Sequence, residues 1–459
     1  MDRMSPLDAS FLHIEDAVNH MHIGSIAVFE GPAPTSEEFE SLVAGKMPLV
    51  PRYRQKVRFV PLQVGRPVWV DDPHFNVGYH VRHTALAPPG GDHELRNLVG
   101  RVMSQQLDRH KPLWEMWMVE GLEDGHWAIV SKVHHCMVDG VSGTDLLAVM
   151  LDSEPEPARP TQTEWVPAPE PTDARLVLDS LVDLVRPYEQ VRAVRSATRA
   201  PRAALSQLRE VGRGLRAWTG VARPVPHSSL NGPIGPHRRW DWARTTLADV
   251  KTVRRALGGT VNDVVLSVLT RGFRDLLIER GESVDDRVVR TLVPVSVRSE
   301  SERGTYNNRV SGMIAELPVG IADPRERLEA IRAQMNGLKD SKQAVAGEVL
   351  TSLSGFAPSL LLALGTRVAV RIPQRNINTV TTNVPGPQWQ LYACGRQMLE
   401  AFPFVPLGPK MRVTVAIFSY HGMLNYGITG DYDTSDDISV LCRGIEAGMT
   451  ELLKLADAR

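Results

Sequence analysis

The hydrophobic pattern of residues 1–152 alternates between the periods of strands and helices. Residues 22–31 (HIGSIAVFEG) are rich in β-branched residues and close on a glycine, which predicts a strand followed by a turn. Residues 36–47 begin with a serine and acidic residues, as a helix N-terminus does. Residues 93–109 carry hydrophobic side chains every three to four positions, which predicts a second helix. These positions are Leu95, Leu98, Val99, Val102 and Met103.

Four further hydrophobic runs in this part predict strands. Residues 55–62 and 66–72 each contain a proline, which suits an edge strand or a break. Residues 114–122 and 126–135 flank the turn sequence Glu-Asp-Gly and predict a β-hairpin. The second strand of this hairpin runs directly into two adjacent histidines, and a helical pattern follows them at residues 141–151.

The chain from residue 236 onward repeats this mixed pattern. Strands are predicted at residues 238–247, 287–298, 308–319 and 377–387, and a hairpin at 411–432. Helices are predicted at residues 247–257, 261–280, 324–338 and 344–371, and from about Asp436 onward. The late hairpin and its helix resemble the earlier hairpin and its helix. We therefore expect two similar α/β domains with mixed sheets.

A proline-rich stretch separates the two halves. Residues 153–172 (SEPEPARPTQTEWVPAPEPT) contain six prolines, which predicts an extended, semi-rigid linker. The chain has 459 residues, more than a single hydrophobic core usually serves. We therefore divide it into a first domain at residues 1–152, a connecting region at 153–235 and a second domain at 236–459.

The connecting region is also rich in arginine. Residues 174–223 contain ten arginines, no lysine and four acidic residues. Hydrophobic positions fall on one face of each of two predicted helices. They are Leu178, Leu181, Val182 and Val185 in the first, and Leu205, Leu208, Leu215 and Trp218 in the second. Two interpretations stay open: the helices pack on the domains with solvated arginines, or they lie on an anionic membrane surface.

Composition narrows the class of protein. Hydrophobic residues make up 42% of the chain, and the net charge of −1 gives no overall field that would recruit nucleic acid. Cys136, Cys394 and Cys442 lie far apart, which is typical of a reduced cytoplasmic protein. Residues 1–20 lack the apolar region of a signal peptide. The most apolar stretch, residues 356–372, is short for a membrane span and contains a proline and an arginine, so only surface attachment stays open.

The densest group of reactive side chains is the sequence HHCMVDG at residues 134–140. After the late hairpin the chain reads TGDYDTS instead, so only the first domain carries histidines here. A metal site is disfavoured because adjacent strand residues point to opposite faces, and because the chain lacks HExxH and paired CxxC spacing. The structural explanation would be two buried, hydrogen-bonded histidines and an ordinary Asp-Gly turn.

The position of the histidine pair favours proton transfer. A strand that ends at a turn before a helix exposes its last side chains at a cleft, where active-site residues are common. Imidazole is the best general base among side chains near neutral pH. One histidine would face the cleft and the other would pack behind it. We expect Asp139 to hold the loop, and Gly140 to allow a close backbone approach or a positive φ.

HHxxxDG is the signature of the CoA-dependent acyltransferase superfamily, which includes chloramphenicol acetyltransferase and the condensation domains of peptide synthetases. Further pieces resemble the bacterial wax ester synthase/acyl-CoA:diacylglycerol acyltransferase family, closest to the actinobacterial triacylglycerol synthases. They are SPLDASF (5–11), PLWEMW (112–117), VNDVVL (261–266) and TTNVPGP (381–387), in matching order and spanning nearly the whole chain. The resemblance implies two chloramphenicol-acetyltransferase-like domains with the active site in a tunnel at their interface.

The resemblance also implies roles in the chemistry. His135 would be the general base, while His134 and Asp139 would shape the site. Asn262 would reach the site from the second domain as a candidate oxyanion donor, and Asp263 would brace the start of its helix. Taken singly, VND is also an ordinary helix start, since Asn and Asp suit that place.

The remaining pieces concern substrate binding. The resemblance implies that Pro112, Leu113 and Trp114 border the substrate channel or hold its wall, and that Asn383 lies near the domain interface. Gly140 would let backbone approach the substrate. Taken singly, PLW could be core packing and NVPGP an ordinary turn.

The implied reaction is direct acyl transfer from long-chain acyl-CoA to diacylglycerol or a long-chain alcohol, which makes triacylglycerol and wax esters for storage. His135 would take the proton of the alcohol and return it to the CoA thiolate, so acyl-CoA is a substrate and neither cofactor nor metal is expected. An acyl-enzyme on Cys136 is the chemical alternative. Because the acceptor dissolves in lipid, we expect a cytoplasmic protein that can attach to membrane or lipid-droplet surfaces.

Three other classes of protein stay as alternatives. They are a condensation-type acyltransferase with a non-lipid acceptor, a non-catalytic lipid-binding protein and a metallohydrolase.

Overall fold

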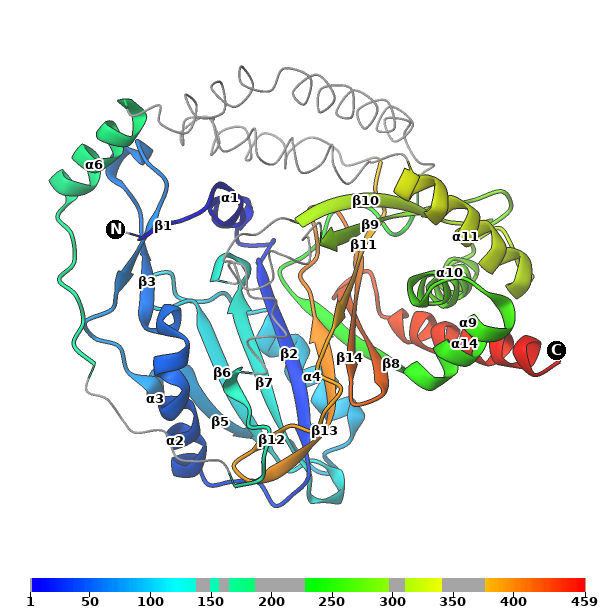
Figure 1. Cartoon of the computed structure of the whole chain (residues 1–459), viewed down its shortest axis with the longest axis horizontal. Coiled ribbons are helices and arrows are strands. Elements are labelled where there is room, and N and C mark those ends of the chain that lie inside the picture. The colour runs from blue at the N-terminus through cyan, green and yellow to red at the C-terminus, as the bar shows by residue number, and fades with distance from the viewer. Residues whose placement is uncertain are drawn as a thin grey trace.

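In the computed structural model the chain forms two lobes that meet side by side, each built on a sheet (Figure 1). The structure describes residues 2–137, 149–156, 165–185, 228–296, 310–340 and 376–458. Several predictions fall outside these ranges. They concern Asp139 and Gly140, most of the helix at 141–151, the arginine-rich stretch beyond Val185, and the helix at 344–371.

The first lobe contains a six-stranded mixed sheet. Its strands, in spatial order, are β12 (Tyr392–Ala393), β13 (Arg396–Phe404), β2 (His22–Phe29), β7 (Trp127–His134), β6 (Trp114–Glu120) and β5 (Val81–Ala85). The helices of this lobe are α1 (Pro6–Ile14), α2 (Ser36–Lys46), α3 (Val77–His80) and α4 (Asp92–Met103). A small sheet of β1 (Asp2–Arg3), β4 (Val68–Asp71) and β3 (Gln55–Arg58) lies beside helix α6 (Asp173–Val185).

The second lobe contains another six-stranded mixed sheet. Its order is β10 (Val310–Leu317), β9 (Val289–Ser296), β11 (Thr379–Pro385), β14 (Val413–Tyr420), β15 (Met423–Asp431) and β8 (Arg238–Thr246). Helices α9 (Leu247–Leu257), α10 (Val261–Glu279), α11 (Pro324–Asp340) and α14 (Ile438–Asp457) cover its outer face (Figure 1). Their hydrophobic sides form one core with the sheet, in which α10 packs against α14. The predicted mixed α/β class is therefore confirmed.

The two sheets repeat one pairing scheme. In the first, β5 runs parallel to β6, and β6, β7 and β2 then pair antiparallel. In the second, β11 runs parallel to β14, and β14, β15 and β8 then pair antiparallel. The last residue of β7, His134, pairs with His22, and the last residue of β15, Asp431, pairs with Arg238. The internal repeat seen in the two hairpins therefore extends to four strands, and the histidines lie only in the first copy.

The strand β13 was not predicted, and it changes the domain picture. Residues 392–404 fall in the range 236–459, yet β13 pairs with β2 and completes the first sheet. The range 236–459 is therefore not one self-contained sheet.

The lobes are joined along the part of β13 that β12 does not pair with. Its carbonyl groups at Ala401 and Pro403 accept hydrogen bonds from the side chains of Asn425 (2.8 Å) and Trp240 (3.3 Å) in the second lobe. Gly427 lets β15 approach so closely that a Cβ there would lie 1.8 Å from the oxygen of Pro403. The contact between the sheets therefore depends on the absence of a side chain at this position.

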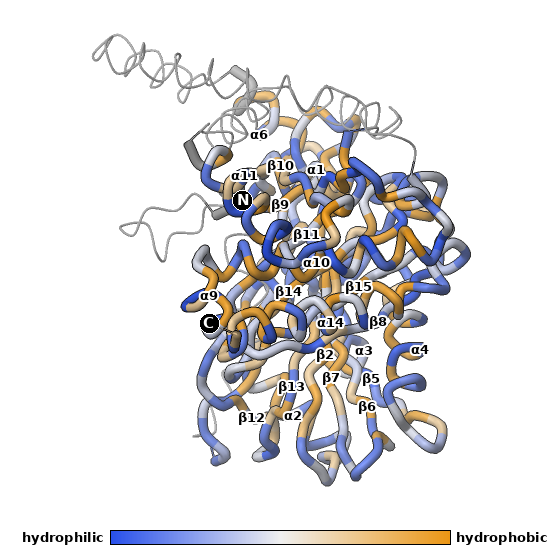
Figure 2. The backbone as a smooth tube through the Cα atoms, turned by 90° about the vertical axis from the view of Figure 1, so that its right-hand side faces the viewer, coloured by the Kyte–Doolittle hydropathy of each residue, from blue (hydrophilic) through white to orange (hydrophobic). Residues whose placement is uncertain are grey.

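Helix α4 fills the space between the first sheet and β8. Its buried face packs with Trp240 and Trp242 of β8 and with Phe402 and Phe404 of β13. Arg96 on α4 is ion-paired with Asp241 on β8 at 2.7 Å. In Figure 2 the strands carry long hydrophobic stretches, whereas the helices alternate between hydrophobic and hydrophilic residues.

Two predicted elements are shorter in the structure than the sequence pattern suggests. The helix predicted at 93–109 ends at Met103, because the buried Nζ of Lys132 donates to the carbonyl groups of Val102 (3.0 Å) and Gln105. A lysine that binds final carbonyls ends a helix favourably. The strand predicted at 55–62 ends at Arg58, and a short 3-10 turn begins at Pro61.

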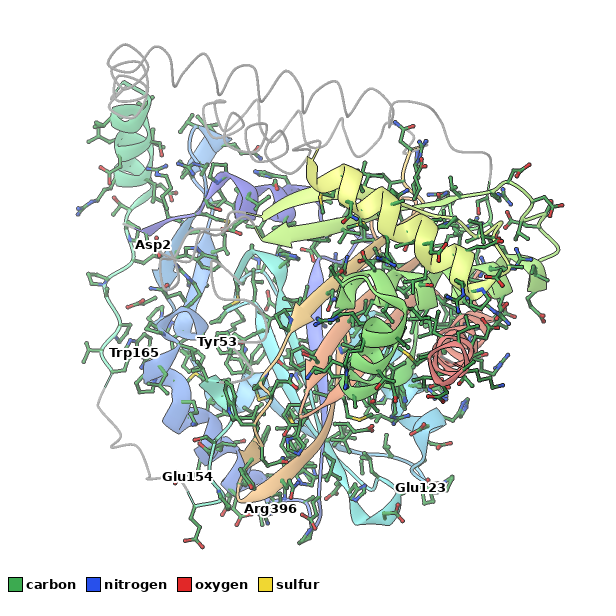
Figure 3. The ribbon with its side chains drawn as sticks, turned by 45° about the vertical axis from the view of Figure 1, so that its right-hand side comes forward. Asp2, Tyr53, Glu123, Glu154, Trp165 and Arg396 are labelled. Carbon is green, nitrogen blue, oxygen red and sulfur yellow. The ribbon has the colours of Figure 1, made fainter. Side chains whose placement is uncertain are left out.

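The structure describes the predicted linker at residues 153–156 and 165–172. Trp165 lies against the ring of Phe75, with the centroids 6.3 Å apart, and the guanidinium of Arg54 lies 4.6 Å from its centre (Figure 3). Residues 165–172 contain no helix or strand, and they lead into α6. This part of the linker is therefore irregular and is held against the first lobe.

Candidate active site

The two histidines lie where β7 ends. His134 is the last residue of the strand and is buried, with 1% of its surface exposed. His135 begins a 3-10 turn that runs to Met137, so the strand ends between the two residues. The rule that strand neighbours face opposite sides therefore does not separate them here. Their rings are nevertheless held by different partners.

The ring of His135 is stacked on Phe11 of helix α1. The centroids are 4.0 Å apart and the planes are inclined by 29°. The backbone N–H of His135 donates to the carbonyl of Met21 at 2.8 Å. Its buried Nδ1 has no hydrogen-bond partner among the described residues. Burial lowers the pKa of His135 to about 4, so the imidazole is neutral at pH 7 and able to accept a proton.

His134 is held by polar groups on both ring nitrogens. Its Nδ1 accepts a hydrogen bond from the backbone N–H of Cys136 at 3.1 Å. Its Nε2 faces the carboxylate of Glu15 at 3.5 Å. Because Nδ1 accepts this hydrogen bond, it carries no proton, and the ring proton lies on Nε2.

Glu15 is the centre of a buried polar group that the sequence did not reveal. Its carboxylate is 3% exposed and contacts Arg109 at 2.6 Å, His22 at 3.3 Å and His134 at 3.5 Å. Burial opposes the charge, but polar contacts from His134 and His22 outweigh it and hold the pKa of Glu15 well below its usual range. Burial lowers the pKa of His22 to about 3. The group therefore contains an ionised Glu15–Arg109 pair and a neutral His22.

The structure explains why three separate pieces of sequence matter. Helix α1 begins in SPLDASF with Ser5 as its N-cap, supplies Phe11 and ends at Ile14, with Glu15 as its C-cap. The piece PLWEMW supplies the carbonyl of Leu113, which accepts the N–H of His134 at 2.9 Å. The histidine pair thus sits where segments far apart in the sequence meet. The missed residues Phe11 and Glu15 lie in or just after a piece that had already been singled out.

The side chains of Pro112, Leu113 and Trp114 are buried. Trp114 is stacked between Tyr53 and His80 at centroid distances of 4.7 and 4.5 Å, and its Nε1 donates to the carbonyl of Tyr53 (Tyr53 is labelled in Figure 3). These contacts make the piece a support for the end of β7. Its place along a substrate channel remains a prediction.

Asn262 and Asp263 begin helix α10 in the second lobe. Asp263 and Thr260 form a capping box: the N–H of Thr260 donates to Asp263 at 2.7 Å, and the N–H of Asp263 donates to Thr260 at 3.2 Å. Asp263 therefore braces this helix start. Asn262 is partly exposed in the first turn. Its place beside His135 remains a prediction.

Asn383 lies on β11, where it pairs with Ile417 of β14. The next residues of β14, Phe418 and Tyr420, are buried in the core of the first lobe. The strand beside Asn383 therefore passes into the contact between the lobes, which supports its expected position.

Cys136 does not have the surroundings of a nucleophile. The residue is fully buried, and burial raises its pKa well above the usual value for a thiol. Reactive cysteines instead lie at accessible sites that lower the pKa. Among the described residues, no group of three or more His, Cys, Asp or Glu side chains could hold a metal ion.

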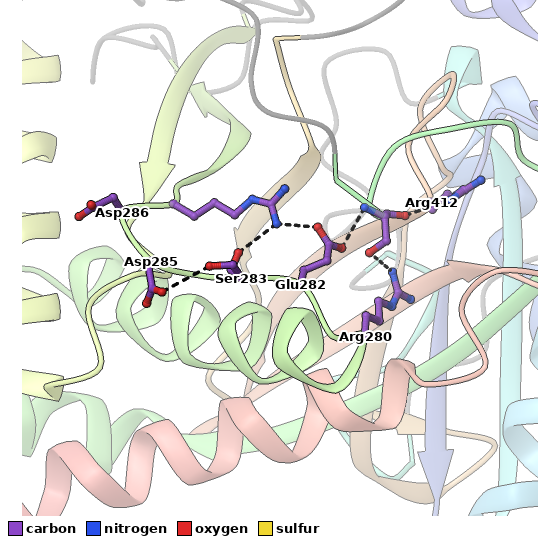
Figure 4. A pocket seen from close by; sticks show the side chains of 8 residues that line it. Arg280, Glu282, Ser283, Asp285, Asp286 and Arg412 are labelled. Atoms are coloured by element: carbon purple, nitrogen blue, oxygen red, sulfur yellow. Dashed lines mark hydrogen bonds and ion pairs between the residues drawn. The ribbon is translucent and has the colours of Figure 1, made fainter.

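A surface pocket of the second lobe lies apart from the histidines. Figure 4 shows residues from 280–287 and Arg412 around it. Its three arginines are already engaged. Arg280 binds Asp437 and Arg287 binds Glu282, both at 2.6 Å, and Arg412 donates to the carbonyl groups of Ser229 (3.2 Å) and Pro233 (3.3 Å). The residues that line it include no histidine, and we connect the pocket with no reaction.

Comparisons with known proteins cover the chain in two parts. The model of the wax ester synthase/diacylglycerol acyltransferase catalytic domain matches residues 4–265, and that of the WS/DGAT C-terminal domain matches residues 306–453. A probable diacylglycerol O-acyltransferase of Mycobacterium tuberculosis (strain ATCC 25618 / H37Rv) is 37% identical over 100% of this chain and 97% of its own length. A putative diacylglycerol O-acyltransferase of Mycobacterium bovis shows the same identity and coverage.

Two solved structures share the fold. The wax ester synthase/diacylglycerol acyltransferase from Marinobacter aquaeolei VT8 has a TM-score of 0.69 at 24% identity, covering 99% of this chain and 100% of that one. The first condensation domain of the calcium-dependent antibiotic synthetase has a TM-score of 0.60 at 16% identity, covering 99% and 96%.

Proposed function

Because the chain belongs to the wax ester synthase/diacylglycerol acyltransferase family, we propose that it transfers a long-chain acyl group from acyl-CoA to diacylglycerol or a long-chain alcohol. The products are triacylglycerol and wax esters. The full-length similarity to the mycobacterial diacylglycerol O-acyltransferases supports this acceptor class. Acyl-CoA is a substrate, and the reaction needs no cofactor.

One observation carries the proposed chemistry: His135 is held by the ring of Phe11 and by the backbone at the end of β7. An alcohol becomes a good nucleophile as a base removes its proton, and a neutral imidazole can do this. The proton then passes from the imidazolium to the departing CoA thiolate. The fully buried, protonated thiol of Cys136 supports direct transfer over an acyl-enzyme.

The tetrahedral intermediate carries an oxyanion that needs a hydrogen-bond donor. We propose Asn262 for this role, with Asp263 fixing its helix start. Asp139 would hold the loop after His135, and Gly140 would allow the substrate close to the backbone. Pro112, Leu113, Trp114 and Asn383 would border the substrate path between the lobes.

Release of CoA thiol tests the reaction directly. We expect palmitoyl-CoA with diolein or hexadecanol to give steady thiol release and a matching acylglycerol or ester, and omission of the acceptor to stop it. A chelator should leave the rate unchanged, because the base is a histidine. Transfer to amine acceptors alone would favour a condensation-type enzyme. Binding of diolein without any turnover would favour a lipid-binding protein.

We further propose that a cytoplasmic enzyme of this kind docks on lipid surfaces through helix α6. Helix α6 buries Leu176 against Val60, Val68 and Val70. The hydrophobic face that was predicted from the sequence is exposed to solvent. Leu178 is 62% exposed, Leu181 48% and Val182 39%. Exposed hydrophobic residues on one helix face suit an interface between water and lipid. Among the described residues, no helix is both long and apolar enough to cross a membrane.

Replacing both Leu178 and Leu181 with serine should lower the partition coefficient onto phosphatidylcholine/phosphatidylglycerol vesicles by about thirtyfold, because roughly 1 kcal/mol is lost per leucine. Flotation measures the change. Leu49 and Ile278 are 62% and 50% exposed elsewhere and provide the matched control. An equal loss in a variant with serine at both control positions would contradict docking through α6. Activity on detergent-dispersed substrate should stay the same in both.

A further inference from the structure

We propose that Glu15 is a positioning residue for acyl transfer. Glu15 keeps the proton of the His134 ring on Nε2 and fixes the orientation of this ring, and the ring in turn holds the backbone turn that presents His135. This inference rests on the proposed role of His135 as the base. Glu15 itself is not placed in contact with the substrate.

The first step of the argument is the burial of a charge. A carboxylate that is 3% exposed is costly unless it is paired, and Arg109 supplies the pair through Nη2 at 2.6 Å and Nε at 3.1 Å. Both of these bonds go to Oε2. The other oxygen, Oε1, faces the N–H of Met21 at 3.4 Å and His22 Nε2 at 3.3 Å. Arg109 therefore holds the carboxylate in one orientation, with its remaining acceptor capacity turned toward the histidines.

The second step concerns the proton of His134. Glu15 Oε2 lies 3.5 Å from Nε2, which is long for a hydrogen bond, but a carboxylate at this range still favours a proton on the nitrogen that faces it. With Nε2 protonated, Nδ1 keeps its lone pair for the N–H of Cys136. If the proton moved to Nδ1, two donors would face each other and the hydrogen bond to Cys136 would be lost.

The third step links these contacts to His135. Two backbone N–H groups hold it in place, its own and that of Cys136, and they donate to the carbonyl of Met21 and to Nδ1 of His134. Met21 in turn donates its N–H to Glu15. The ring of His135 stacks on Phe11, whose carbonyl accepts the N–H of Glu15 at 3.1 Å. His135 is thus held by Met21, His134 and Phe11, and each of these three residues also contacts Glu15.

Glu15→Gln tests the proposal at nearly constant shape. Arg109 will keep the amide oxygen at the place of Oε2, so the NH2 group will replace Oε1 and face the N–H of Met21. The variant therefore loses the charge and gains a clash of donors beside the carbonyl that holds His135. We expect kcat to fall by about tenfold to a hundredfold, as for other residues that orient a reacting group. KM for palmitoyl-CoA should change little, since substrate contacts remain.

Glu115→Gln is the matched control. Glu115 is a largely buried glutamate on β6 of the same lobe, and its carboxylate contacts Arg82 at 3.2 Å, Lys132 at 3.9 Å and the Nε1–H of Trp117. If Glu15 only stabilised the fold, Glu15→Gln and Glu115→Gln would have the same kcat per folded molecule. Thermal melts measure the folded fraction of each variant. Equal values of kcat would overturn the proposal.

The proton on His134 gives a readout that does not depend on activity. In 15N-labelled wild-type protein, with the signal of His134 identified by its loss in His134→Asn, we expect Nε2 to be protonated and Nδ1 to be free. Glu15→Gln should move the 15N signal of the protonated Nε2, because a neutral amide oxygen replaces the charged oxygen beside it, and Glu115→Gln should leave that signal in place. A wild-type His134 protonated on Nδ1, or an unchanged ring in Glu15→Gln, would overturn the proposal. Absence of acyl transfer in the wild type would instead count against the proposed function, and the spectra would still decide the role of Glu15.

Discussion

Replacing His135 with alanine is expected to lower kcat for acyl transfer by about a thousandfold, while the protein stays folded. The magnitude is that of a lost general base. Burial lowers the pKa of His135 to about 4, so the imidazole is neutral at working pH and has a ring nitrogen with a lone pair that can accept the proton of the alcohol. Thiol release from palmitoyl-CoA with diolein, beside a thermal melt, measures both parts of the expectation.

His134→Ala is the comparison for this variant. His134 is 1% exposed and its ring accepts the N–H of Cys136, so its removal should act through stability and through the position of His135. We expect a smaller loss of kcat together with a lower melting temperature. A folded His134→Ala protein without turnover, next to an active His135→Ala protein, would reverse the two roles.

The second large effect is expected at the contact between the lobes. Gly427→Ala should lower the free energy of unfolding by about 3 kcal/mol or more, because its Cβ would lie 1.8 Å from the oxygen of Pro403. The atom that the new Cβ would meet belongs to the backbone of β13. This strand is fixed by its pairing with β2, so it cannot move aside as a flexible side chain could. Denaturant unfolding followed by tryptophan fluorescence is a suitable measurement, because Trp240 lies beside this contact.

Gly337→Ala serves as the control for this substitution. Gly337 lies in helix α11, and a Cβ there would meet nothing within 4 Å. Alanine in a helix interior is favoured over glycine, so this variant should gain about 0.5–1 kcal/mol. A Gly427→Ala protein as stable as the wild type would show that β13 and β15 can separate without cost.

The sequence by itself determined the elements whose hydrophobic pattern is local. The strand at residues 22–31, the hairpin at 114–135 and the helix at 261–280 were predictable because period and turn residues lie within one short window. The same holds for the histidine pair at the end of a strand. The roles of individual residues came from resemblance to a family, and those of Asn262 and Asp139 stay predictions.

Only the tertiary structure decided what surrounds the pair. Glu15 is one acidic residue among many in the sequence, and it becomes significant because Arg109, His22 and His134 converge on it. The strand β13 was missed because proline and charged residues interrupt its pattern, and its partner β2 lies at the other end of the chain. Local periodicity reports which side of an element is buried, but it carries no information about which distant segment buries it. The site therefore became visible only when the fold brought helix α1, the end of β7 and the start of β2 together.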